Sequence, residues 1–197
     1  KLKKKILLIA GGYSNERAIS LLTAKSVYSE LKKNIKYYLK IIEPDGNFTK
    51  KLRLYKPDVV LNLLHGRYGE DGYIQSILES EKIKYTHSGV KSSAIAIDKE
   101  LSKKLFIKNN IPTPKYVKFE FKKNIIKKNI IKIIKNKLDF PVVVKPINEG
   151  SSVNVYICNK SNFINNLYKL QNYGEVLIEK FIPGREIQVA IFGSQKL

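Results

Sequence analysis

Short apolar runs that alternate with helix-patterned segments constrain the fold of this chain more than any other feature. Residues 5–10 (KILLIA) and 59–64 (VVLNLL) are continuous apolar runs of strand length, which is typical of strands buried in a parallel sheet. Between them lie a segment with helical spacing over 19–32 and a predicted strand at 37–42. Strands that alternate with helices predict βαβ units. We therefore expect a Rossmann-like α/β layer.

The order of elements changes in the second half of the chain. Helices are expected over 93–109, 122–138 and 161–171, and strands at 116–121, 141–145, 153–158, 175–182 and 186–192. The order after Pro114 is that of an α+β module. We expect three parts: a Rossmann-like N-terminal domain (1–88, the substrate side), a small central α+β subdomain (89–184), and the first strand of a third, truncated domain (185–197).

Composition narrows the function classes. The net charge is +20, from 37 basic and 17 acidic residues, which predicts an anionic partner. Most of the cations are lysines dispersed along the chain, whereas a nucleic-acid interface usually concentrates them, so we expect no nucleic-acid partner. Cys158 is the single cysteine, and His65 and His87 are the two histidines, so neither a disulfide framework nor a zinc site is expected. No run of about 18 apolar residues exists, and we expect a cytoplasmic protein without a membrane partner.

The segment 122–138 is strongly amphipathic. Isoleucines and a leucine share one face and lysines occupy the other. Such a helix can lie on a membrane surface. The simpler interpretation, which we favour, is an ordinary packed stripe with a solvated basic face.

Two polar clusters follow predicted strands, where α/β proteins bind ligands. Gly11-Gly12 begins a strand-to-helix turn that either binds an anion through its N–H groups or is only a tight turn. In that turn Glu16 either holds a ligand ammonium or merely complements the helix dipole. The second cluster, HGRYGEDG (65–72), contains His65, which either binds a carboxylate or is structural.

A third cluster, PVVVKPINEGSSV (141–153), places Lys145 at the end of an apolar strand, before a Gly-Ser loop. A lysine in that position is costly unless it meets an anion. Small residues can cover phosphates with backbone N–H and hydroxyl groups. The spacing is not that of a Walker P-loop, so a nucleotide would be bound by another architecture.

Together these segments resemble the D-alanine–D-alanine ligase family of the ATP-grasp superfamily. The segments that carry the resemblance are GGYSNERAISL, LHGRYGEDGYIQSILE, YTHSGVKSSAIAIDKELSK, PVVVKPINEGSSV and EVLIEKFIPGREIQVAIFG. The resemblance implies a Rossmann-like domain followed by ATP-grasp subdomains. It also implies a reaction in which ATP phosphorylates one D-alanine and the amine of a second attacks the acyl phosphate, for peptidoglycan precursor synthesis.

The resemblance implies the residues that contact ATP. Lys99 and Lys145 match the phosphate lysines, and Ser151 and Ser152 lie in the mobile loop over the triphosphate. Asn154 stands where family members commonly have glycine, which is expected to stiffen this loop without loss of chemistry.

The adenine and ribose contacts are implied in the same way. Glu179 matches the adenine carboxylate, and Lys180 and Ile182 supply backbone groups to the base. Glu186 matches the carboxylate that takes the ribose hydroxyls.

For the first D-alanine, Glu16 matches the glutamate that holds its ammonium group, through a hydrogen-bonded link with Ser151. His65 matches the histidine near its carboxylate. We therefore expect Glu16 and Ser151 to be catalytic residues and Glu16 and His65 to bind substrate.

The family uses Mg²⁺ or Mn²⁺, and the matching metal ligands are expected downstream of Leu197, with none in this chain. The chain alone is therefore expected to be inactive, and the full-length protein to be a homodimer. Two alternatives stay open: a non-catalytic ATP-grasp binding module and a D-alanine–D-lactate type ligase.

Overall fold

The computed structural model describes residues 3–121, 127–191 and 193. The elements of the first half alternate as strand and helix: β1 (Lys4–Ile9), α1 (Arg17–Leu31), β2 (Tyr37–Ile42), α2 (Phe48–Tyr55), β3 (Val59–Asn62) and α3 (Tyr73–Ser80). The strands form a three-stranded parallel sheet in the order β2-β1-β3, in which Ile6 pairs with both Leu39 and Val59. The predicted parallel α/β layer is confirmed.

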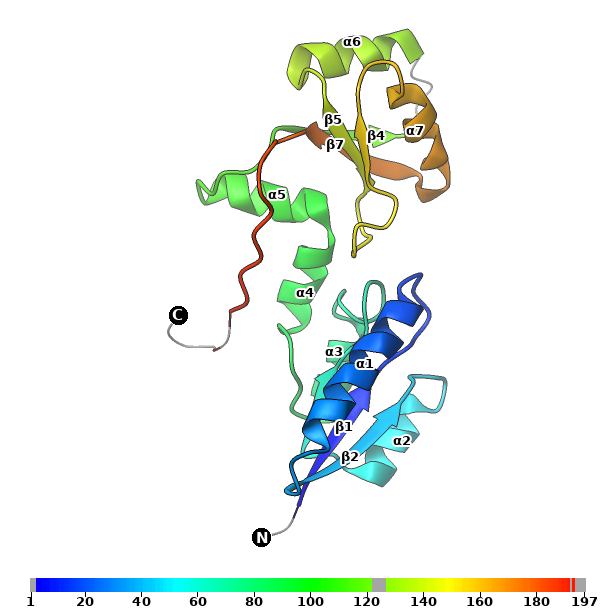
Figure 1. Ribbon diagram of the computed structural model, residues 1–197, viewed down its shortest axis with the longest axis vertical. Coiled ribbons are helices and arrows are strands. Elements are labelled where there is room, and N and C mark those ends of the chain that lie inside the picture. The colour runs from blue at the N-terminus through cyan, green and yellow to red at the C-terminus, as the bar shows by residue number, and fades with distance from the viewer. Residues whose placement is uncertain (1–2, 122–126, 192, 194–197) are drawn as a thin grey trace.

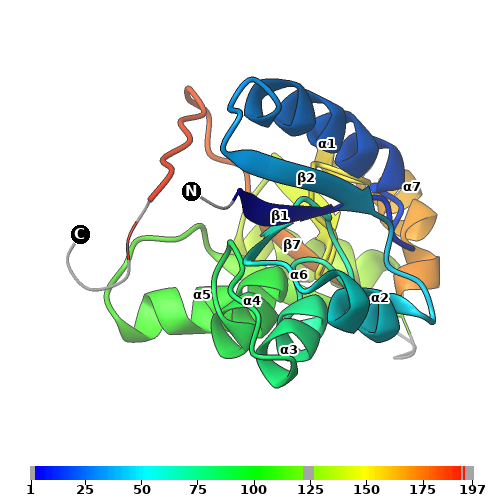
Figure 2. The same cartoon turned by 90° about the horizontal axis from the view of Figure 1, so that it is seen from below.

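Helices cover both faces of this sheet. Helix α1 lies on one side and α2 and α3 lie on the other (Figure 2). On the second side, alternate residues of β1 and β3 pack on the helices, and the core residues are Leu7, Ile9, Phe48, Leu52, Val60, Leu64, Ile74 and Leu78. Because parallel strands share one direction, the loops after β1 and β3 meet at the same edge.

Two helices, α4 (Val90–Ile97) and α5 (Lys99–Lys108), connect this sheet to the second half (Figure 1). The single helix expected over 93–109 is therefore divided at Asp98. That residue has an extended backbone, and its side chain accepts a hydrogen bond from the Leu101 N–H at 2.9 Å. Asp98 thus caps α5, which explains why the helix restarts there.

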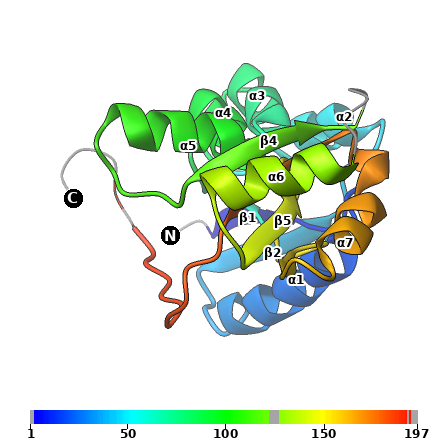
Figure 3. The same ribbon diagram turned by 90° about the horizontal axis from the view of Figure 1, so that it is seen from above.

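The second half forms a separate antiparallel sheet. Its elements are β4 (Tyr116–Glu120), α6 (Lys127–Lys137), β5 (Val142–Pro146), β6 (Tyr156–Cys158), α7 (Phe163–Lys169), the 3₁₀ turn η1 (Gln171–Tyr173) and β7 (Glu175–Lys180). The strand order is β4-β7-β5-β6. Helices α6 and α7 cover one face (Figure 3), where their side chains share a core with alternate strand residues. The α+β order expected from the sequence is confirmed.

The amphipathic segment forms α6 as a packed helix. Ile130, Ile134 and Leu138 belong to the core beneath it, which supports the packed-stripe interpretation over a membrane surface. Residues 122–126 of the expected helix lie outside the described residues. Across the helices that the structure describes, none combines the length and the apolar character that crossing a bilayer requires.

The end of the chain differs from expectation. Residues 186–191 form no strand and are exposed, and Phe192 lies outside the described residues. The reason is that none of the described strands pairs with this segment, and a strand needs a neighbour for its backbone N–H and C=O groups. In Figure 1 the segment leads from the end of β7 toward the C-terminus.

Candidate active site

The site is built around a loop of the second half that reaches the first half. The Gly-Ser loop (residues 147–155) leaves β5 and points from the antiparallel sheet toward the start of α1 (Figure 1). Ser151, Ser152 and Asn154 have positive φ angles of 45°, 57° and 55°. Left-handed backbone is costly for most residues but tolerated by asparagine, so Asn154 fits this turn. Asn154 also donates to the Tyr173 hydroxyl at 2.7 Å, so its side chain fastens the loop.

Glu16 lies at the junction between the halves. It precedes α1 without making a side-chain capping hydrogen bond, and its residue is 1% exposed. Neither Oε1 nor Oε2 has a hydrogen-bond partner. The carboxylate lies against two glycines: a Cβ on Gly66 would be 2.5 Å from Oε1, and a Cβ on Gly150 would be 3.1 Å from it.

A buried carboxylate that accepts no hydrogen bond is unfavourable, although the charge of Lys99 is near enough to interact with Glu16. A bound ammonium group would supply the missing hydrogen bonds. The helix-dipole alternative for Glu16 is weakened, since a residue with that role would be exposed or hydrogen-bonded at the helix end. The expected hydrogen-bonded link from Glu16 to Ser151 is not formed, because the carboxylate faces Gly150 while Ser151 is exposed in its left-handed turn.

The Gly11-Gly12 turn is not an open anion site. The Gly11 N–H donates to Ser20 Oγ at 2.8 Å, and the Gly12 N–H donates to Glu43 Oε1 at 2.9 Å. Arg17 donates to both oxygens of Glu43, at 2.7 and 2.8 Å. The chain therefore supplies its own carboxylate to this turn and neutralises it with Arg17, which decides the question in favour of a tight structural turn.

His65 lies on the α1 side of the loop 65–72. Its Nε2 is 3.2 Å from Thr23 Oγ1, and its Nδ1 is 3.7 Å from Glu70 Oε1. Glu70 also accepts the Gly66 N–H at 2.9 Å. The loop is thus held by its own carboxylate, with the imidazole placed between α1 and that carboxylate.

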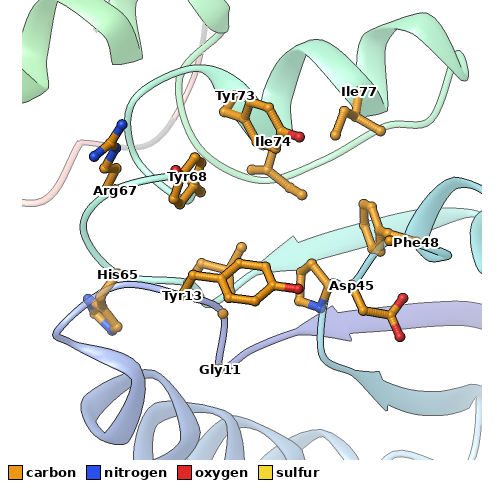
Figure 4. A pocket seen from close by; sticks show the side chains of 14 residues that line it. Gly11, Tyr13, Asp45, Phe48, His65, Arg67, Tyr68, Tyr73, Ile74 and Ile77 are labelled. Atoms are coloured by element: carbon orange, nitrogen blue, oxygen red, sulfur yellow. The ribbon is translucent and has the colours of Figure 1, made fainter.

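A cavity of about 550 Å³ lies on the other side of this loop (Figure 4). Tyr13, Tyr68 and Tyr73 are among its lining residues. The ring centroids of Tyr13 and Tyr68 are 6.4 Å apart, and those of Tyr68 and Tyr73 are 5.3 Å apart. Its volume suits a small ligand. His65 is among its lining residues, whereas Glu16 is not.

The two expected phosphate lysines come together at the Gly-Ser loop. Lys99 and Lys145 line one cavity of about 260 Å³ with residues 149–153. Lys99 Nζ donates to the carbonyl of Glu149 and, at 3.2 Å, to that of Ile147. Burial and then the nearby positive charge of Lys145 hold the pKa of the Lys99 ammonium below its ordinary value. Two lysines beside a loop of small residues fit a phosphate group.

Lys145 and Glu179 share the face of the antiparallel sheet that α6 and α7 do not cover. Val143 pairs with Glu179 across β5 and β7, and Lys145 is two residues further along β5. Lys145 Nζ forms an ion pair with Glu179 Oε1. Burial raises the pKa of Glu179, but the hydrogen bonds and charges of Lys145 and Lys103 outweigh it and hold the pKa below its ordinary value.

The remaining expected nucleotide residues lie at the end of β7 and beyond. The Lys180 N–H donates to the Lys115 carbonyl at 2.9 Å. Ile182 and Glu186 are exposed, in the irregular segment after β7. The structure therefore brings Lys99, Lys145 and Glu179 into one cluster and leaves Glu186 outside it.

The comparisons with known proteins agree on one family. Residues 105–197 match the family model described as D-ala D-ala ligase C-terminus. The D-alanine–D-alanine ligase of Pelagibacter ubique (strain HTCC1062) is 63% identical over 194 residues, which cover 98% of this chain and 63% of that protein. The chain is thus similar to D-alanine–D-alanine ligases over nearly its whole length. The ligase of Zymomonas mobilis is 42% identical, with 99% of this chain and 60% of that protein covered.

Solved ligase structures of the family share the fold. The D-alanine–D-alanine ligase of Bacillus anthracis superposes with a TM-score of 0.77 at 35% identity, over 92% of this chain and 58% of that chain. The same enzyme complexed with ATP gives 0.74 at 33% identity, over 92% of this chain and 60% of that chain. The chain thus spans less than two thirds of the length of the ligases it matches.

Lys103 is a site residue that sequence reasoning missed. It is 6% exposed, and its Nζ forms an ion pair with Glu179 Oε2 at 2.9 Å. In the sequence it is one of 37 basic residues, followed directly by another lysine. Only its position on the buried side of α5 distinguishes it.

Proposed function

We propose that the protein is an ATP-dependent ligase that joins two D-alanine molecules into D-alanyl-D-alanine for peptidoglycan precursor synthesis. The observation that carries this proposal is the buried, unpartnered carboxylate of Glu16 beside the Gly-Ser loop, which also borders the cavity of Lys99 and Lys145. A carboxylate that accepts no hydrogen bond and two lysines that line one cavity lie within one junction. An amino acid and a phosphate chain supply the opposite charges.

In this proposal the chain acts mainly by positioning and by neutralising charge. Glu16 holds the ammonium of the first D-alanine, and His65 faces its carboxylate. That carboxylate attacks the terminal phosphate of ATP and forms an acyl phosphate, and ADP leaves. The amine of the second D-alanine then attacks the acyl carbon and releases phosphate.

Lys99 and Lys145 neutralise the phosphates in this scheme, and Ser151 and Ser152 close over them. Glu179 receives the adenine together with backbone groups of Lys180 and Ile182, and Glu186 takes the ribose. The lysine cavity and the buried hinge carboxylate support the first part of this assignment.

The metal, the assembly and the division of the chain are also parts of the proposal. Mg²⁺ or Mn²⁺ would neutralise phosphate charge. Among the described residues no cluster of three His, Cys, Asp or Glu side chains suits a metal ion, so we assign it no ligand here. We propose a cytoplasmic homodimer, with domains over 1–88 and 89–184 and a further subdomain that begins at 185.

The test is phosphate release by the full-length protein with ATP, Mg²⁺ and D-alanine, together with chromatographic detection of the dipeptide. We expect release to depend on D-alanine and one dipeptide to form for each phosphate. ATP binding without D-alanine-dependent release would instead make the protein a binding module. Faster release with D-lactate as a second substrate would make it a D-alanine–D-lactate ligase.

A further inference from the structure

Lys103 makes a complete set of contacts in a buried position. Its Nζ lies 2.9 Å from Glu179 Oε2 and donates to Thr113 Oγ1 at 2.9 Å and to the Pro114 carbonyl at 2.8 Å. It also lies 5.4 Å from the centroid of the Tyr116 ring. An ammonium group has three N–H donors, and these three oxygens account for all of them. Lys103 is therefore a fixed charge with no donor left for a ligand.

Glu179 lies between Lys103 and Lys145, and only one of these two lysines has access to the phosphate cavity. Lys145 holds Oε1, has a side chain that is 19% exposed and lines the phosphate cavity. Lys103 holds Oε2 and is not among the residues that line that cavity. Lys145 can thus leave Glu179 for an incoming phosphate group, whereas Lys103 cannot.

We propose that Lys103 is a positioning residue for nucleotide recognition: it fixes Glu179 through Oε2, so that Oε1 accepts the exocyclic amine of the base when Lys145 turns to the phosphates. This inference rests on the proposed function. Lys103 acts only through Glu179 and touches neither base nor phosphate.

The charges explain why a second lysine is needed. When Lys145 turns to the phosphates, Glu179 loses one of its two cations while it remains buried. Without Lys103, the carboxylate would then be a buried charge without a balancing cation. Either Lys145 would stay on Glu179, or, once Lys145 had left, the carboxylate would be free to rotate. Either effect weakens the recognition of the base by Glu179.

The experiment compares ADP with inosine diphosphate (IDP) by titration calorimetry on the full-length protein. IDP carries a carbonyl oxygen where adenine has its exocyclic amine, so it offers Glu179 no donor at that position. A hydrogen bond to a charged group contributes about 1.5–3 kcal/mol, which corresponds to a preference for ADP of roughly tenfold to a hundredfold in the wild type. In Lys103→Met we expect this preference to fall to about threefold or less.

Two further variants separate positioning from general damage. Lys103→Arg keeps a cation on Glu179 and is expected to restore part of the preference for ADP. Lys104→Met is the matched control, because Lys104 is the next residue of α5, its side chain is 58% exposed and it pairs with Glu100. It should leave the ratio of ADP to IDP affinity unchanged.

The outcomes distinguish the inference from the function on which it rests. A wild-type protein that binds neither nucleotide overturns the proposed function, and this inference with it. A wild type that prefers ADP, with an unchanged ratio in a folded Lys103→Met, overturns the role of Lys103 alone. Should Lys103→Met not fold, Thr113→Val decides: it removes one hydrogen-bond partner of Lys103 and should lower the ratio severalfold, whereas an unchanged ratio overturns the inference.

Discussion

The carboxylate of Glu16 lies against Gly150, so closely that a Cβ atom on that glycine would be 3.1 Å from Oε1. Glu16 precedes α1, which packs on the parallel sheet. Gly150 lies in the loop between β5 and β6 of the antiparallel sheet. Their contact encloses the carboxylate without giving it a hydrogen bond. Residues of both halves of the chain thus lie against this buried carboxylate.

Glu16→Gln should lower activity and raise stability together. The substitution removes a charge that costs free energy in the unliganded protein, so the unfolding midpoint should rise. Loss of one partner of a buried charged hydrogen bond costs about 2–5 kcal/mol in binding, which is roughly 30-fold to several thousandfold in the KM for the first D-alanine. The measurements are steady-state kinetics and thermal unfolding, with ADP affinity expected to stay nearly constant.

The matched control for that variant is Glu30→Gln, in the helix that Glu16 precedes, with a side chain that is 72% exposed. It should change neither the kinetics nor the midpoint beyond error. A Glu16→Gln protein with D-alanine kinetics within about threefold of wild type and a lower midpoint would support the helix-dipole role instead.

Gly66→Ala should destabilise the protein. Gly66 has a φ of 67°, and a Cβ there would be 2.5 Å from Glu16 Oε1. Left-handed backbone costs a non-glycine residue about 1–2 kcal/mol, and the close contact adds to this. Denaturant unfolding should show a loss of at least that size. Gly46→Ala, where nothing lies within 4 Å, is the control; equal losses in both variants would refute the argument.

Glu179→Gln should destabilise the protein in a pH-dependent way. The pKa of Glu179 is lowered on folding, so its ionised form contributes stability above the ordinary value of 4.5 and loses it as pH falls through the lower folded value. Removing the charge leaves two lysines without their partner and costs about 3–5 kcal/mol at pH 7. Urea unfolding should show this difference shrinking below pH 4.5.

Glu175→Gln, in the same strand, is the comparison for that series. Glu175 is exposed and pairs with Lys118, so its loss should cost about 1 kcal/mol or less. A Glu179→Gln penalty that stays constant between pH 7 and pH 3 would contradict the proposed ion-pair contribution.

Cys158 should resist thiol reagents in the folded protein. It is buried in the core of the antiparallel sheet, and burial raises the pKa of its thiol. The reactive thiolate is therefore both scarce and inaccessible. A chromogenic disulfide reagent at pH 8 should label it at the rate of unfolding, and at once in urea. Fast labelling of the native protein would show that this core opens locally.

The sequence is sufficient to predict most of the strands and both sheets, because continuous or alternating apolar runs report burial directly. It did not lead us to α2, whose buried Phe48 and Leu52 are only two positions, four residues apart, among lysines and an arginine. That spacing was a readable signal. The helix break at Asp98 was readable too, from an aspartate three residues before Leu101.

The site was predictable where a residue's neighbours in sequence carry the signal, as at Lys145 after its apolar strand. It was not predictable where burial or partners come from distant segments. From the sequence alone, the Gly12 N–H could bind an anionic ligand. In the structure it donates instead to Glu43, which follows β2. Nor does a sequence reveal that Glu16 lacks a partner or that Lys103 has three, since both facts depend on how α5, β7 and the Gly-Ser loop pack.

The pairing of β5 with β7 has a consequence for how the chain reaches its native state. Lys145 and Glu179 share one face, while Val142, Val144, Val176 and Ile178 share the other with the core. A slip of one residue in either strand would turn a charged side chain into that core and a valine out of it. The two charges therefore disfavour misaligned pairing of β5 with β7. Replacing both with apolar residues would remove the proposed nucleotide contacts and also permit a second, misaligned sheet.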